Sequence, residues 1–500
     1  MNASEHPNIA IALQQLAICE PDAEAIVASD LTLSREKLFR IVECYADCML
    51  QRGVRQGDLV SIRSEDAIVT IASVFALSLI GAQYVPFGAE LATGRLPVTH
   101  FLRSADQAPS NDITEIVIDA DWSPRHHIPS HSAADMAGFG DNTSVCWISP
   151  TSGTTGNPKY IAITVATLNR RLAAIAADYT RRPTRLMMLF AASSRPFIIR
   201  AVAALVNGHV LIDSDSPRFA EAAKVDFMCA SPQQIRLWLG EQRLQRRIPV
   251  LQVSGAKLPR EQIARLLETF DRVEDVYGSN ETIKAHVTVF QHANGTLNAS
   301  TKAGPGTVEV VDAKDNLCPV GQTGRIRIKN DCMVNEYLGD PLATARHFKS
   351  GWYYPGDLGH WQPDGLLQIQ GRDGEMVNIE GQKLYLADID ALLCSAPGIQ
   401  AASCFEDPQI DADTRLSACV KLSDDTLGFE TVEAAWLACV RALGVLAAPG
   451  SILIASDLPL TTDGIAKRDG AKKYFVDAVK NATPVSLKGR LFKFEIDYDA

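Results

Sequence analysis

Ten consecutive residues, 150–159, place glycines, hydroxyl side chains and a lysine directly after an apolar run. They read Pro-Thr-Ser-Gly-Thr-Thr-Gly-Asn-Pro-Lys, and the apolar run occupies residues 145–148. Backbone N–H groups freed by glycine, Ser and Thr hydroxyls and an ammonium are the donors that a polyphosphate needs. The glycines lie too close together for a Walker loop, and residues 160–164 read as a strand. The pattern therefore predicts a phosphate-binding loop between two strands; the alternative is a surface turn rich in Ser, Thr and Gly.

Length and composition set the broad class. The chain has 500 residues, and a single core stops growing at about 250 residues, so we expect more than one domain. A formal net charge of -11 argues against a nucleic-acid partner. Eleven cysteines without a CxxC pair argue against zinc and disulfides, and we expect reduced thiols in a cytoplasmic protein. The most apolar run, residues 67–81, is shorter than the about 20 residues that cross a bilayer, so it predicts a buried helix and no membrane partner.

Helical and strand patterns alternate along most of the chain, which predicts sheets covered on both faces by helices. Short strands with turn residues at 308–329 predict a small β subdomain, and enough chain follows Arg372 for a separate α/β domain. The expected helices are 34–52, 67–81, 166–177, 197–206 and 233–239, with Pro232 at the start of the last, and the expected strands are 58–62, 84–87, 115–118, 210–212 and 227–230.

Three further segments follow the loop in order: Tyr277-Gly278-Ser279-Asn280-Glu281, Tyr353-Tyr354-Pro355-Gly356-Asp357 and Gly371-Arg372-Asp373-Gly374. With the loop, they resemble the motifs of the acyl-adenylate-forming superfamily. That family includes acyl-CoA synthetases, aryl-acid ligases, luciferases and the adenylation domains of nonribosomal peptide synthesis. The resemblance covers residues 31–468. It implies a large N-terminal domain at 1–371, with helix-covered β-sheets and a small β subdomain, and a small mobile C-terminal α/β lid domain at 372–500.

The resemblance implies that a carboxylic acid attacks the α-phosphate of ATP, which gives an acyl-adenylate and pyrophosphate. Negative charge grows on the phosphoryl oxygens, so positioned donors, a cation and Mg²⁺ supply most of the catalysis. The residues implied in ATP binding are Thr151, Ser152, Gly153, Thr154, Thr155, Gly156, Lys159, Gly255, Ala256, Tyr277, Gly278, Asp357 and Arg372.

Single roles follow from the same resemblance, each beside a structural alternative. Glu281 would bind Mg²⁺, which takes one or two carboxylates; the alternative is a solvated charge. Asn280 stands where the family usually has Thr, and its amide retains phosphate contact. Tyr277 would stack on adenine, or be a core tyrosine. Asp357 would bind the two ribose hydroxyls, or cap its Pro-Gly-Asp turn. Arg372 would contact ribose or phosphate at the hinge, or be a surface arginine.

The C-terminal part departs from the family pattern at the catalytic lysine. The family carries this lysine directly after the glycine of a Pro-x-Thr-x-x-Gly-Lys segment, and here Ile465 follows Gly464. Lys467 lies two residues later, which keeps the same face of an extended segment but moves the ammonium about 6–7 Å. Two hypotheses remain open: Lys467 substitutes as the catalytic cation, or adenylation lacks that cation and runs slowly.

The acid-binding pocket of the family lies between the helix before Gly208, the strand around Ser254 and the loop after Glu281, which makes Ser254 and Ser279 candidate substrate residues. Amino-acid-activating members carry an aspartate on that helix. Alignment from Gly208 places Arg195 there, and alignment from Phe190 places Ala191 there. Neither residue pairs an ammonium, so we expect a non-amino acid, either aryl or dicarboxylic, whose second anion Arg195 would bind.

The expected acceptor is a thiol, either of CoA or of a carrier-protein phosphopantetheine. Only about thirty residues follow Arg468, so a carrier would be a separate protein. The competing hypothesis is a catalytically degenerate member that binds nucleotide as a scaffold, which Ile465 and Asn280 favour. A luciferase-like oxygenase shares the first half-reaction and stays open as a third class.

Overall fold

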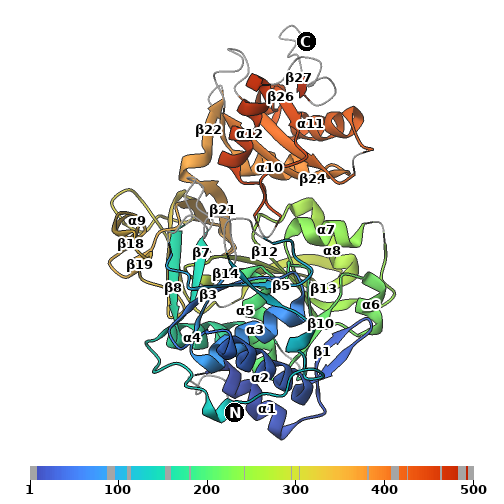
Figure 1. The fold of residues 1–500 in the computed structure, drawn as a ribbon. Coiled ribbons are helices and arrows are strands. Elements are labelled where there is room, and N and C mark those ends of the chain that lie inside the picture. The colour runs from blue at the N-terminus through green and yellow to red at the C-terminus, as the bar shows by residue number, and fades with distance from the viewer. Residues whose placement is uncertain are drawn as a thin grey trace.

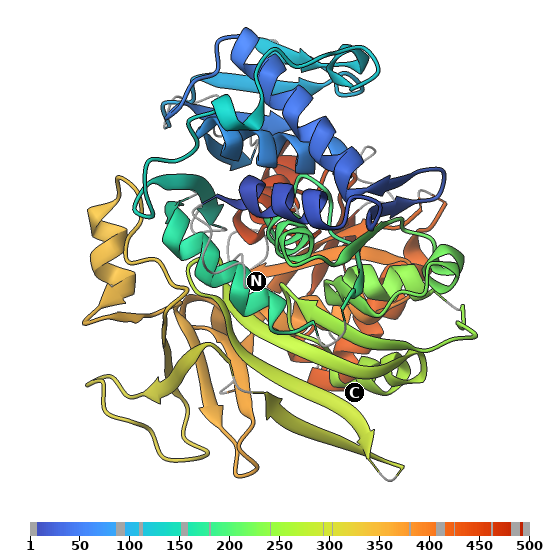
Figure 2. The same cartoon turned by 90° about the horizontal axis from the view of Figure 1, so that it is seen from below.

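The computed structural model describes residues 8–86, 96–109, 114–151, 159–179, 182–240, 242–293, 295–302, 304–379, 382–406, 416–424, 426–461, 464–481 and 491–493. A large part, blue to yellow in Figure 1, carries a smaller C-terminal part, orange to red. The smaller part lies on one side of the large part in Figure 1 and behind it in the view from below (Figure 2).

A nine-stranded sheet forms the centre of the large part. Its six inner strands, β13-β12-β11-β9-β10-β1, run parallel, and antiparallel strands flank them on both sides. In sheet order the strands are β15 (Thr296–Lys302), β14 (Ile283–Ala293), β13 (Phe270–Ser279), β12 (Ile248–Ser254), β11 (Phe227–Ala230), β9 (Arg185–Met188), β10 (Val210–Asp213), β1 (Glu24–Ala28) and β2 (Thr32–Ser34).

Helices cover both faces of this sheet, as the alternating pattern predicts. Successive residues of β9 enter different cores, because side chains of a strand alternate between its faces: Leu186 packs with α1, α3 and α5, and Met187 with α6, α7 and α8. The helices are α1 (Ile9–Cys19), α2 (Arg35–Gln51), α3 (Ala67–Ile80), α4 (Val165–Ala176), α5 (Arg195–Val206), α6 (Pro217–Ala222), α7 (Pro232–Leu239) and α8 (Arg260–Thr269).

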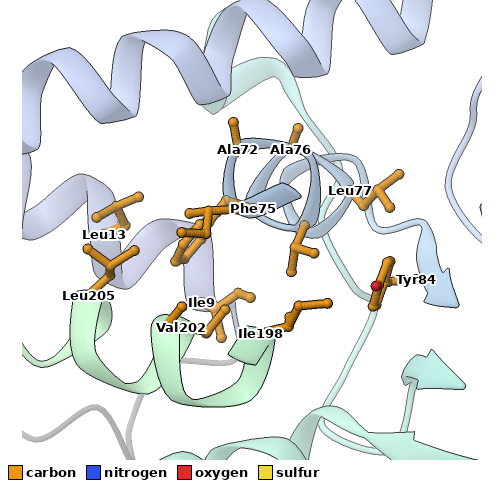
Figure 3. Packing of buried hydrophobic residues seen from close by; sticks show 14 of the residues in the cluster. Ile9, Leu13, Ala72, Phe75, Ala76, Leu77, Tyr84, Ile198, Val202 and Leu205 are labelled. Atoms are coloured by element: carbon orange, nitrogen blue, oxygen red, sulfur yellow. The ribbon is translucent and has the colours of Figure 1, made fainter. Parts of the chain in front are cut away.

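A six-stranded sheet shares the first of these cores. Figure 3 shows Phe75 of α3 next to Leu13 of α1 and Val202 of α5, while Tyr84 of β4 lies at the far side of the same group, beyond Ile198. The apolar run at 67–81 is thus a buried helix, and burying such side chains stabilises a fold by about 1.5–3 kcal/mol each. The strands in order are β6 (Glu115–Ile118), β5 (His100–Ser104), β3 (Leu59–Arg63), β4 (Gln83–Pro86), β7 (Val145–Thr151) and β8 (Lys159–Thr164).

The small β subdomain forms where short strands were expected. Its strands are β16 (Gly306–Val311), β17 (Gly324–Asn330), β18 (Phe348–Lys349), β19 (Trp352–Tyr353), β20 (Asp357–Trp361) and β21 (Leu367–Arg372), with helix α9 (Pro341–His347) before β18. The Asp312 side chain accepts the backbone N–H groups of Lys314 and Asn316, which closes the turn after β16.

The C-terminal part packs its own α/β cores. A hairpin of β22 (Met376–Ile379) and β23 (Gln382–Tyr385) precedes a sheet of β24 (Ile399–Glu406), β25 (Leu416–Leu422), β26 (Ser451–Ile454) and β27 (Leu491–Lys493). Its helices are α10 (Leu386–Ser395), α11 (Phe429–Leu443) and α12 (Arg468–Asn481). The two core clusters here contain only residues beyond 376.

Polar contacts join the two parts. Arg236 of α7 donates to the carbonyl oxygens of Ala396 (3.2 Å) and Ile399 (2.6 Å), just after α10. Lys257 forms a 2.6 Å ion pair with Asp388 of α10. Both contacts use the end of the large part where the parallel strands finish. The C-terminal part therefore faces the carboxyl edge of the central sheet.

All eleven cysteines are free thiols, and ten of the eleven have their pKa raised, in each case chiefly by burial. Within the described ranges, no helix has the length and apolar character needed to cross a membrane.

His209 gives the fold a pH dependence. Its Nδ1 accepts the backbone N–H of Thr184 at 3.0 Å, and burial, with Arg182 and Arg35 nearby, lowers its pKa to about 4. The folded state resists protonation of His209. The stability that the neutral ring contributes is therefore complete above the unfolded pKa of 6.5 and is lost as the pH falls toward about 4. The free energy of unfolding, measured by denaturant titration, should fall by about 2–3 kcal/mol as the pH falls over that range. This pH-dependent fall should be smaller in His209→Asn than in wild type, and unchanged in the exposed control His292→Gln. The same pH dependence of the unfolding free energy in all three proteins would contradict the role of His209.

Candidate active site

The second sequence motif and the segment after Ser254 lie at the carboxyl edge of the parallel strands. Strand β12 ends at Ser254 and β13 at Ser279, and Ser254 pairs in register with Val276. Gly255 follows with φ of 98°, a left-handed conformation that favours glycine, and the backbone at Gly255 and Ala256 is exposed. Open parallel sheets bind ligands at this edge, so the placement suits a nucleotide site.

The expected phosphate loop lies between two strands. Strands β7 and β8 pair antiparallel, with Thr151 directly opposite Lys159. Thr151 is buried and Lys159 half-buried, so the ends of the loop are fixed to the sheet. The loop itself, with Ser152, Gly153, Thr154, Thr155 and Gly156, lies outside the described residues.

The Lys159 ammonium is held by two aromatic side chains. Its Nζ lies 3.1 Å from His347 Nε2 and 4.9 Å from the centre of the Tyr337 ring. Burial lowers the pKa of Lys159, and Glu281 and Asp340 offset part of that effect. An ammonium has three donors, so Lys159 retains donor capacity for a phosphate oxygen.

Glu281 is buried in the turn between β13 and β14. Its Oε1 accepts a 2.7 Å hydrogen bond from the Tyr337 hydroxyl, and its backbone carbonyl accepts from Arg171 Nη2 at 3.0 Å. The same tyrosine thus contacts both Glu281 and Lys159. A single carboxylate with one oxygen outside this hydrogen bond fits Mg²⁺, which binds proteins through one or two carboxylates and takes phosphate oxygens and water besides.

Tyr277 and Asp357 meet across the second and third motifs. The Tyr277 hydroxyl donates to Asp357 Oδ2 at 2.6 Å, and Arg372 Nε lies 3.5 Å from Asp357 Oδ1. Burial raises the pKa of Asp357, against the opposing effects of Arg372 and Tyr277. Arg372 is two-fifths exposed at the end of β21, opposite Asp357 in register. The three residues form one polar cluster.

The remaining second-motif residues connect the segments. A Cβ on Gly278 would lie 1.8 Å from the carbonyl oxygen of Ile283, so only glycine fits. Asn280 Nδ2 donates to the carbonyl oxygen of Pro150 at 2.6 Å, and the Ser279 hydroxyl lies 3.3 Å from that of Thr282. Asn280 therefore joins the second motif to the start of the phosphate loop through one N–H of its amide, and its second N–H and its oxygen lie outside this bond.

The segment around Lys467 forms a turn against the large part. Leu460 bridges Ala466, Thr461 N–H donates to the Ile465 carbonyl at 2.7 Å, and α12 begins directly after Lys467. A Cβ on Gly464 would lie 3.9 Å from Gln233 Oε1 of α7, which places the turn near the carboxyl edge. The Lys467 side chain is exposed. Among the described contacts it has none to the other candidate site residues.

Arg195 opens helix α5 and lines a small pocket. The pocket wall also includes Tyr84, Trp147, Ile198 and Ser149, which directly precedes the phosphate-loop segment. The Tyr84 and Trp147 rings pack edge to face, with centroids 6.0 Å apart. The pocket is therefore aromatic and apolar, with one guanidinium.

A buried ionic network lies next to α5. Asp178 pairs with Lys284 (2.8 Å) and Lys302 (2.8 Å), and Lys302 also reaches Glu274 at 3.2 Å. Gln252 Nε2 donates to both carboxylates, at 3.0 and 3.2 Å. Burial raises the pKa of Asp178, but the two lysines outweigh it and the pKa is lowered. Both carboxylates are thus already neutralised.

The structure brings part of the expected set together. Tyr337 joins Lys159 to Glu281, Asn280 bonds Pro150 next to the loop, and Tyr277, Asp357 and Arg372 form a separate contact cluster. Two contributors were missed by sequence reasoning, Tyr337 and His347. Both lie between the second and third motifs, where no local pattern marks them.

The chain is similar to several known proteins. The sequence profile of the AMP-binding enzyme family matches residues 13–338. Indoleacetate–CoA ligase of Aromatoleum aromaticum (strain DSM 19018 / LMG 30748 / EbN1) is 25% identical over 424 residues, which cover 76% of this chain and 81% of that protein. A linear gramicidin synthase of Brevibacillus parabrevis is 25% identical over 91% of this chain, which spans 9% of its length.

Among solved structures, the fold is similar to that of the o-succinylbenzoate coenzyme A synthetase of Bacillus subtilis in complex with ATP and magnesium ion. The TM-score is 0.74 at 18% identity, over 92% of this chain and 99% of that one. The family profile spans well over half of this chain, and all four motifs contribute described residues to the candidate site. The chain is therefore a member of the AMP-binding enzyme family.

Proposed function

We propose that this chain activates a carboxylic acid as an acyl-adenylate, with release of pyrophosphate, and passes the acyl group to a thiol of CoA or of a carrier protein. The contact of Tyr337 with both Lys159 and Glu281 is the observation that supports it most strongly. A cation for phosphate and a carboxylate for Mg²⁺ are thereby held together, beside a polar cluster suited to ribose.

In the proposed reaction, the acid carboxylate attacks the α-phosphorus and the bond to the pyrophosphate oxygen breaks. Lys159 would balance charge on the departing phosphates, and Asp357 would accept the ribose hydroxyls while Tyr277 stacks on adenine. Bound Mg²⁺, held through Glu281, would supply further neutralisation of phosphate charge. A thiolate then attacks the acyl carbon, and AMP leaves with the electron pair of its bond.

Trapping the intermediate tests this proposal. With ATP, Mg²⁺ and the correct acid, hydroxylamine should convert the acyl-adenylate to a hydroxamate and release AMP. A product that requires both ATP and acid supports adenylation; ATP binding with no hydroxamate from any acid supports the degenerate alternative.

For the acid, we propose a non-amino aryl or dicarboxylic acid. Arg195 suits a second anion because its fork matches carboxylates, and the Tyr84 and Trp147 rings lie beside it. The buried carboxylates nearest α5, Asp178 and Glu274, are occupied by lysines, so a substrate ammonium would lack a counter-charge.

Replacing Arg195 should change selectivity among acids. Arg195→Leu is expected to lower kcat/KM for an acid with a distal carboxylate by about 10- to 100-fold relative to its monocarboxylic analogue, because a charged hydrogen bond is lost. Pyrophosphate release with paired acids measures this ratio. Arg243→Leu, at an arginine whose side chain is 87% exposed, is the control. An unchanged ratio, or robust turnover of a free amino acid, would contradict the assignment.

A further inference from the structure

His347 connects the third motif to the phosphate-loop lysine. It is the last residue of α9, and its backbone carbonyl accepts the N–H of Tyr354 at 2.7 Å. Its ring Nδ1 lies 2.8 Å from the Tyr354 carbonyl oxygen, and its Nε2 lies 3.1 Å from Lys159 Nζ. The ring is also stacked against Tyr353, with centroids 6.3 Å apart.

These two contacts determine which nitrogen of the imidazole ring carries the proton. A carbonyl oxygen only accepts, so Nδ1 carries the hydrogen and donates to Tyr354. Nε2 therefore presents its lone pair, and the Lys159 ammonium donates to it. A protonated ring would have a hydrogen on Nε2 as well, directed at a group that has only donors.

The charged groups around the ring oppose its protonation. Burial lowers the pKa of His347, and Lys159 of β8 and Arg346 of α9 lower it further. The Tyr354 carbonyl and the Glu281 carboxylate act in the other direction, but the pKa remains below its usual value. Arg372 and Asp340 influence the neighbouring Lys159. The neutral ring is thus the form present near neutral pH.

We propose that His347 is a positioning residue that holds the Lys159 ammonium for phosphate through the neutral ring, and releases it when the ring is protonated. Binding of MgATP then weakens in acid. The inference rests on the proposed function, since it assumes that Lys159 binds the phosphates of ATP. It adds a residue to the site and a pH response that the motifs do not contain.

Calorimetric titration of the full chain with MgATP, from about pH 8 to about pH 5.5, tests the proposal. His347→Gln keeps a neutral acceptor at the end of the side chain, and His347→Ala removes it. At alkaline pH, the alanine variant should bind about tenfold more weakly than wild type, while the glutamine variant stays within about twofold. In acid, the affinity of wild type for MgATP should fall relative to that of the glutamine variant, by less than about tenfold at about pH 5.5, because the pKa of His347 lies below its usual value. His292→Gln, at an exposed histidine, is the matched control.

A ratio of wild-type to glutamine-variant affinity that is constant with pH would overturn the proposal. Tighter binding of MgATP by wild type in acid would also overturn it, since the imidazolium would then be a phosphate ligand itself. Both proteins bind the same nucleotide, so protonation of the ATP phosphates in acid affects both affinities equally and cancels in their ratio. The titration needs no acid substrate, so absence of adenylation would defeat the proposed function and leave this measurement standing.

Discussion

Glu281→Gln is expected to reduce acid-dependent pyrophosphate release by about a thousandfold, because the metal-binding charge is lost while the shape is kept. Metal neutralisation of transition-state charge is worth several kcal/mol, and each 1.4 kcal/mol is about tenfold in rate. The glutamine amide oxygen still accepts from the Tyr337 hydroxyl, so the buried turn is retained. Steady-state kinetics over a range of Mg²⁺ concentrations measure the effect.

Two controls separate the metal from the hydrogen bond. Tyr337→Phe removes only the hydroxyl, and we expect a loss of about tenfold. Glu268→Gln, at a carboxylate that is 60% exposed on α8, should leave turnover unchanged. If Glu281→Gln keeps both its rate and its dependence on Mg²⁺, Glu281 is not the metal ligand.

Lys467→Ala is expected to lower adenylation by about a hundredfold, because we propose that Lys467 supplies the cation that Ile465 does not. Lys467 and Ile465 lie two residues apart in the same arm of the turn, and Gly464 of this turn lies close to Gln233 near the carboxyl edge. Lys has a long flexible stem, and we propose that the exposed Lys467 enters the site when the C-terminal part moves. Pyrophosphate release measures the adenylation step directly.

A second exchange tests whether the position of the cation matters. Ile465→Lys, introduced into the Lys467→Ala variant, should recover most of the lost activity. Lys472→Ala, on an exposed lysine of α12, is the control. Wild-type turnover in Lys467→Ala would show that adenylation proceeds without this lysine.

Much of the fold follows from local patterns. Pro232 begins α7 because its missing N–H costs nothing in the first turn, and the apolar run after Asp66 forms α3 because it can be buried on every side. The strand before the phosphate loop, β7, was expected from its apolar run. The order of the nine strands depends on long-range pairing, such as β1 beside β10, which single segments do not encode.

The site was predictable where short motifs carry it, and not elsewhere. Tyr277, Glu281, Asp357 and Arg372 were expected from their segments. His347 and Tyr337 reach the site only because the end of α9 and the segment before α9 lie against β8, a tertiary arrangement without a local signal. The hydrogen bond from the Asn280 amide to the Pro150 carbonyl oxygen likewise joins two segments that are 130 residues apart.

The central claim is that this chain adenylates a carboxylic acid. The most direct test is pyrophosphate release by the wild-type protein with ATP and Mg²⁺, across aryl, short-chain, fatty, dicarboxylic and amino acids. We predict release that depends on an aryl or dicarboxylic acid and is abolished in Glu281→Gln. Tight ATP binding with no pyrophosphate release for any acid would contradict the account and identify a nucleotide-binding member without catalysis.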